Sequence, residues 1–112
     1  MTRYLISFDD GTMIIPEAEL AEVSDAAHRV MRSAQAAGVW ITGGGLMSQQ
    51  ALIVESDGRV RPGPYPETKA VLGGFSIIDV ETIDEACAWA ARIARACRCP
   101  QEVRQIMDDP EV

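Results

Sequence analysis

Polar and apolar residues alternate at the start of the chain. Within residues 3–8, Tyr4, Ile6 and Phe8 occupy every second position. A period of two, with Arg3, Leu5 and Ser7 on the other face, predicts a first strand that is buried on one face and partly covered on the other. The Asp-Asp-Gly run at residues 9–11 has turn chemistry and ends that strand.

The next apolar pattern has a period of about 3.6 residues and predicts a helix. Pro16 suits its start, because the missing N–H of proline costs nothing in a first turn, and Gly38 suits the position just past its end. His28 lies about 100° from the centre of the apolar stripe, on a shoulder that can face a cleft. The stripe predicted to be buried comprises Leu20, Val23, Ala27, Val30, Met31 and Ala34.

Short strand patterns and a glycine run fill the middle of the chain. Residues 39–42 and 51–55 are rich in strand-forming side chains, and a tight turn at Asp57-Gly58 predicts that 59–61 returns as a further strand. The glycine triplet at 43–45 lacks the Gly-Lys-Ser/Thr ending of a phosphate-binding loop. It predicts a bend or a bulge.

The last third of the chain predicts a strand, a helix and a final strand. Residues 73–80 form the strand pattern, Thr82 and Glu85 form a capping box, and residues 102–107 can add the last strand. Cys99-Pro100 predicts the end of the helix. The expected buried stripe of this helix comprises Ile83, Ala86, Cys87, Ala90, Ile93, Ala94 and Cys97.

This order of elements predicts an α+β fold. A split βαβ arrangement gives an antiparallel sheet with both helices on one face. The other face would expose Phe75 and Ile77, so we expect it to form a homodimer. We expect one domain at residues 1–107 and a frayed acidic tail at 108–112.

Charge and hydropathy exclude several classes of function. The 112 residues carry a net charge of −7, which argues against binding to a nucleic-acid backbone. No apolar run approaches the twenty residues of a membrane span, and no export signal is visible at the N-terminus. We therefore expect a cytoplasmic protein with neither a nucleic-acid nor a membrane partner.

The cysteines do not form a metal or redox motif. Cys87 and Cys97 are about 15 Å apart along one predicted helix, which is beyond disulfide reach. Cys97 and Cys99 form C-x-C, and C-x-x-C is the spacing of redox and zinc sites. A zinc site formed by the three cysteines and His28 is the alternative; we expect reduced thiols, no metal and no cofactor.

A proline-rich loop supplies the candidate ligand-binding residues. Pro64 and Pro66 restrict the segment 63–69, so Tyr65, Glu67 and Lys69 have few available placements. Lys69 could hold an anionic ligand and Tyr65 could donate a hydrogen bond. The alternatives are a surface ion pair between Glu67 and Lys69 and packing of Tyr65 at a dimer seam.

His28, the only histidine, is the candidate catalytic residue. Imidazole is the usual proton-transfer group near neutral pH. Asp9, Asp10 or Asp79 could hold its tautomer through space, but the spacing selects none of them. The competing interpretation is a surface or hydrogen-bonded structural histidine.

The central block and the helix that follows it resemble the YCII-related proteins, in particular the subgroup named for a DGPF motif. The resemblance extends from the first strand to Arg104. It implies a ferredoxin-like fold that dimerises as an α/β barrel. The matching positions are Gly63, Pro64, Tyr65, Glu67, Lys69, Gly73, Gly74, Phe75, Ile77, Ile78, Val80, Asp84, Glu85, Ala86, Trp89, Ala90 and the run Glu102-Val103-Arg104.

Three departures from the family pattern limit what the resemblance implies about activity. Pro62 stands where the motif has its first Asp, and Tyr65 replaces its Phe. In YCII proteins proper a histidine on the first helix, matched here by His28, is paired with an Asp after the next strand. Residues 46–50 contain no acid.

Two functions remain open from the sequence. One is a non-enzymatic dimeric module that binds a small molecule or a protein partner. The other is a lyase or isomerase in which His28 abstracts a proton from a small molecule. The surroundings of His28 discriminate between them.

Overall fold

The computed structural model describes residues 1–47, 51–68 and 71–112. Four strands form one antiparallel sheet in the order β2 (Trp40–Gly45), β5 (Leu72–Val80), β1 (Thr2–Asp9) and β6 (Glu102–Gln105). Counting only these four strands along the chain, the order is second, third, first, fourth. This is the ferredoxin-like arrangement, and it confirms the predicted α+β fold.

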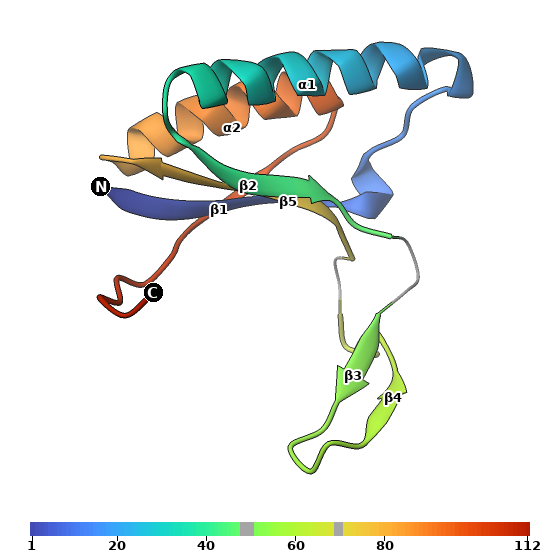
Figure 1. Cartoon of the computed structure of the whole chain (residues 1–112). Helices are drawn as coiled ribbons and strands as arrows, with labels where there is room; N and C mark the ends of the chain where they lie inside the picture. Colours follow the sequence, from blue (N-terminus) through green and yellow to red (C-terminus); the bar gives the residue numbers. More distant parts are fainter. Residues whose placement is uncertain (48–50, 69–70) are drawn as a thin grey trace.

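Both helices lie on the same face of the sheet. Figure 1 shows α1 (Leu20–Ala36) and α2 (Ile83–Cys97) stacked side by side above β1, β2 and β5. None of the helices in the described ranges is long and apolar enough to cross a membrane. Within the described ranges, no helix or strand covers the opposite face of the sheet.

The segment before α1 differs in detail from its prediction. Pro16 precedes a short 3-10 helix, η2 (Glu17–Glu19), and the α-helix itself begins at Leu20, one turn later than expected. An earlier 3-10 helix, η1 (Asp10–Thr12), follows β1. At the other end Gly38 has φ of +75°, as predicted for a residue just past a helix.

The caps of α2 follow from its flanking residues. The Thr82 side chain accepts a hydrogen bond from the Glu85 N–H at 3.2 Å, as the capping box predicts. Arg98 ends the helix in the left-handed conformation with φ of 58°. Its guanidinium reaches Glu19 at 2.7 Å, which joins the end of α2 to the start of the α1 region.

The core lies between the sheet and the helices. Tyr4, Ile6, Ile78 and Val80 from the two central strands pack against small side chains of α2. Of the stripes predicted to be buried, Leu20, Ile83 and Cys87 are exposed. Leu20 and Ile83 are the first residues of their helices, where no preceding turn of the same helix covers them. Cys87 lies at the margin of the apolar face of α2.

A hairpin leaves the main body between β2 and β5. We call residues 51–68 the arm; it contains β3 (Leu52–Val54) and β4 (Val60–Pro62), which pair only with each other. In Figure 1 the arm projects away from the helices, beyond the open face of the sheet. The radius of gyration is 15.5 Å, whereas a compact domain of this length has about 13 Å, which agrees with an extended arm.

Candidate functional site

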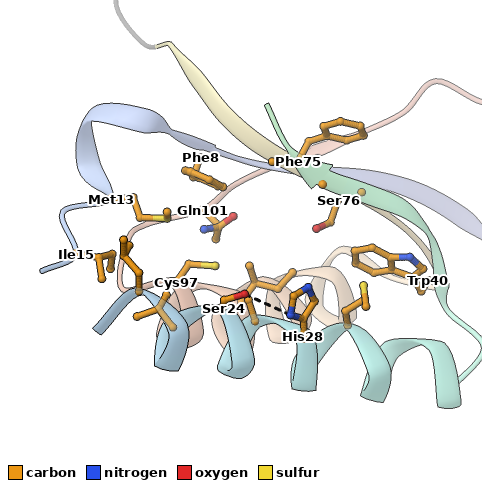
Figure 2. A pocket seen from close by; sticks show the side chains of 18 residues that line it. Phe8, Met13, Ile15, Ser24, His28, Trp40, Phe75, Ser76, Cys97 and Gln101 are labelled. Atoms are coloured by element: carbon orange, nitrogen blue, oxygen red, sulfur yellow. Dashed lines mark hydrogen bonds between the residues drawn. The ribbon is translucent and has the colours of Figure 1, made fainter. Parts of the chain in front are cut away.

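A cavity of about 550 Å³ lies between α1 and the sheet. We call it the α1 cavity; Figure 2 shows His28 pointing into it from α1, with Trp40 and Ser76 on the sheet side. Its walls come from both helices, three strands, the segment before α1 and the segment after α2. The lining residues are Phe8, Met13, Ile15, Leu20, Val23, Ser24, Ala27, His28, Met31, Trp40, Gly43, Gly44, Gly45, Phe75, Ser76, Ile93, Cys97 and Gln101.

Most of these walls are apolar, and the polar groups are few. Ser24, Ser76 and Gln101 supply hydroxyl and amide groups, and His28 supplies an imidazole. No Asp, Glu, Lys or Arg occurs among the described residues that line the cavity. A ligand would therefore gain mainly from apolar contact and from a small number of hydrogen bonds.

The geometry of α1 places Ser24 beside His28. Residues four apart lie on the same helix face, and the Ser24 Oγ is 3.5 Å from the His28 Nδ1. This is a long contact in which either group can donate, according to the tautomer. Among the described residues, the other ring nitrogen, Nε2, has no hydrogen-bond partner and can meet a ligand.

The sheet side of the cavity depends on glycine at position 43. A Cβ there would meet the Phe75 carbonyl oxygen at 2.5 Å and the Trp40 ring at 2.8 Å. The ladder between β2 and β5 is also irregular between Trp40 and Thr42. Because Gly43 has no side chain, β2 can lie close to both β5 and the indole of Trp40. The bend predicted at the glycine triplet therefore forms part of the cavity wall.

The Cys97 thiol lines the cavity at the end of α2, and Cys99 is buried two residues beyond it, outside the lining. Burial, together with the neighbouring Cys99, raises the pKa of the Cys97 thiol. Burial also raises the pKa of Cys99, against hydrogen bonds from Thr12 and Gln101 that lower it. Both groups are therefore neutral thiols at pH 7, and Cys97 presents a weakly polar surface to the cavity.

No carboxylate among the described residues pairs with His28. No salt bridge joins His28 to a carboxylate in the described part of the chain, where its recorded partner is Ser24. Asp79 alternates along β5 with the core residues Ile78 and Val80, so it points to the open face. Its Oδ1 atom is buried there without a hydrogen-bond partner.

The three loop candidates do not converge with His28. Tyr65 is 56% exposed on the arm, where the Arg61 guanidinium lies 5.5 Å from the centre of its ring. Glu67 is also exposed, and neither residue lines the α1 cavity. Lys69 lies outside the described residues. The structure thus separates His28 from the part of the loop that it describes.

No group of three or more His, Cys, Asp or Glu side chains in the described residues could hold a metal ion. Cys97 and His28 both line the cavity, but they come from different helices and lack a third ligand. The three cysteines are free thiols, of which Cys87 is exposed and Cys99 buried.

Sequence reasoning missed most of the cavity walls. Phe8 and Trp40 were assigned only to strands, and Gln101 was given no role. The strand alternation does place Phe8 on the same face as Tyr4 and Ile6, which is the helix-covered face. Nothing in the local sequence indicates that α1 stands away from the sheet there and leaves space.

Comparison with protein families agrees with this fold. The model of the YCII-related domain matches residues 3–108. No curated protein matches the chain at a significant level.

Among solved structures, a 5-chloro-2-hydroxyhydroquinone dehydrochlorinase from Burkholderia phenoliruptrix AC1100, in complex with 2,5-dihydroxybenzoquinone, has a similar fold. The alignment covers 97% of both chains with 15% sequence identity and a TM-score of 0.53. At that identity the likeness concerns the fold.

Proposed function

The chain belongs to the YCII-related domain family, and from this premise we propose that it binds a small, planar, mostly apolar molecule in the α1 cavity. The observation that carries the proposal is the position of His28. The only imidazole of the chain points into a largely apolar cavity, with a serine hydroxyl beside it.

The size and the walls of the cavity support this ligand class. A volume of about 550 Å³ is within the range of small-molecule sites, which is roughly 300 to 1,000 Å³. The indole of Trp40 offers a flat surface for stacking. Since no arginine or lysine is among the described lining residues, the ligand is better matched if it is neutral.

Tryptophan fluorescence tests this proposal. Trp89 is the other tryptophan and lies outside the cavity, so the Trp89→Phe variant leaves Trp40 as the reporter. We expect phenols and hydroxylated quinones to change the Trp40 emission in a saturable way, since the similarly folded dehydrochlorinase is complexed with a hydroxylated quinone. His28→Ala is expected to weaken binding about tenfold, the effect of one hydrogen bond.

The control is Arg32→Ala, which changes an exposed residue one turn further along α1 and outside the cavity. Its affinity should equal that of the parent. Equal affinity of the His28→Ala variant, or saturable binding that leaves Trp40 emission unchanged, contradicts the proposed site.

Proton transfer at His28 is a second candidate function. It is supported by the free Nε2 of an imidazole that faces the cavity. A neutral imidazole can take a proton from a bound hydroxyl or from a carbon next to a carbonyl, which is the first step of many lyase and isomerase reactions. Without a carboxylate beside it His28 is a weaker base, so binding is the primary proposal.

We also propose that the open face of the sheet binds a second copy of the chain. Leu5 and Ile77 are paired across β1 and β5 on this face, and the Phe75 ring points to the same side, away from the cavity. All three are only half-buried in a single chain. A second sheet would remove them from water.

A further inference from the structure

The arm presents an apolar surface that the described part of its chain leaves exposed. Leu52, Val54 and Val60 are 69%, 65% and 59% exposed. The pairs Leu52–Pro62 and Val54–Val60 lie directly opposite each other in the β3–β4 ladder, so these four side chains share one face of the hairpin. We call this the arm face.

The side chains on the other face of the hairpin already have contacts within the arm. Ile53 is only 6% exposed, and its partner across the ladder is Arg61. The Arg61 guanidinium pairs with Glu55 and lies over the Tyr65 ring. A two-stranded hairpin is at best marginally stable alone, so the uncovered arm face needs a packing partner.

We infer that the arm face packs against a second copy of the chain and clasps the homodimer. The inference rests on the dimer proposed above and names a further part of its interface. The arm leaves the body on the side of the open sheet face, away from the helices (Figure 1). A second copy on that face is thus the molecule that the arm can reach.

The open face of the sheet is a small area for a stable dimer interface. Four strands about 4.8 Å apart and about six residues long at 3.4 Å each cover roughly 400 Å². A stable interface buries about 800 Å² on each partner. The apolar arm face supplies additional area next to the sheet.

Charge on the arm does not oppose contact with a second copy. The chain has a net charge of −7, so two copies repel each other. The arm contains three acidic and two basic residues, hence a net charge of −1. Two of its acids pair internally, Asp57 with Arg59 and Glu55 with Arg61. The arm can therefore approach another copy with little of that repulsion.

Sedimentation equilibrium of the full chain over a dilution series tests the inference. We expect the parent to be a dimer at micromolar concentration and the Leu52→Glu, Val60→Glu double variant to have a dimer Kd raised about 100-fold or more. Ile14→Glu with Val112→Glu is the matched control. It places the same two charges on residues that are 83% and 88% exposed and outside the arm.

The outcomes separate the two proposals. A parent that is monomeric at micromolar concentration overturns the dimer and the clasp together. A dimeric parent whose arm variant, with an unchanged circular dichroism spectrum, retains the parental Kd overturns the clasp alone.

Hydrogen exchange provides a measurement that does not depend on variants. The amides of residues 52–54 and 60–62 should exchange faster when the parent is diluted below its dimer Kd. Exchange that is independent of concentration also overturns the clasp.

Discussion

Cys87, Cys97 and Cys99 belong to one helix and its end, yet their surroundings differ. Cys87 is exposed, Cys97 is half-buried beside the cavity, and Cys99 is buried. Because burial disfavours a charged thiolate, the pKa values of Cys97 and Cys99 are raised. The folded state thus prefers the protonated thiols more strongly than the unfolded state does.

A pH series of urea denaturation checks this preference. The stabilisation is fully present below the unfolded thiol pKa, near 8.5, and it is lost as pH rises through the higher folded pKa. We therefore expect the free energy of unfolding to fall between pH 8 and pH 10, and to fall less in Cys97→Ser. Cys87→Ser should leave the pH dependence of the free energy of unfolding as in the parent, since its thiol is exposed. An equal effect of both variants would contradict the attribution of this pH dependence to the buried thiols.

His28 shows how far residue-level reasoning extends. Helical geometry placed it on a shoulder that could face a cleft, and the structure puts it in the α1 cavity. The same reasoning could not assign Tyr65, because its position depends on where a loop turns. The structure places Tyr65 on the arm, with the Arg61 guanidinium over its ring.

At the scale of elements, β2 determines the shape of the cavity. Its three glycines are not equivalent: a Cβ at Gly43 would strike the backbone of β5, whereas one at Gly44 would meet nothing within 4 Å. A side chain at position 43 should therefore disturb the strand, whereas one at position 44 should be accommodated.

Gly43→Ala and Gly44→Ala form a matched pair. The first should lower the free energy of unfolding by about 1–3 kcal/mol, because the added methyl group meets backbone that cannot rotate away. The second should change it by less than about 0.5 kcal/mol, as for a surface substitution. Thermal or urea denaturation measures both, and equal losses would show that the close approach of β2 to β5 is not needed.

Periodicity and caps predicted both helices and the strands of the sheet. The glycine triplet was correctly interpreted as a local backbone feature, but its contact with Trp40 depends on a long-range pairing that no local pattern encodes. For the same reason, the sequence predicts strands at 51–55 and 59–61 but not where the hairpin that they form lies relative to the sheet. Their alternation is equally compatible with a sheet strand and with an independent hairpin.

At the scale of the whole molecule, the two proposed surfaces lie on opposite sides of the sheet. The α1 cavity is on the helix-covered side. Leu5, Ile77 and the arm are on the other side. Ligand binding and dimerisation should therefore be separable.

Ile77→Glu tests this separation. A carboxylate at the centre of the open face should dissociate the dimer, because its burial between two sheets would be unpaired. The ligand affinity reported by Trp40 should remain within about threefold of the parent, since Ile77 does not line the cavity. Met107→Glu, at a residue that is 89% exposed, is the charge-matched control and should remain dimeric. A folded monomeric variant that no longer binds ligand would show that the second copy completes the cavity.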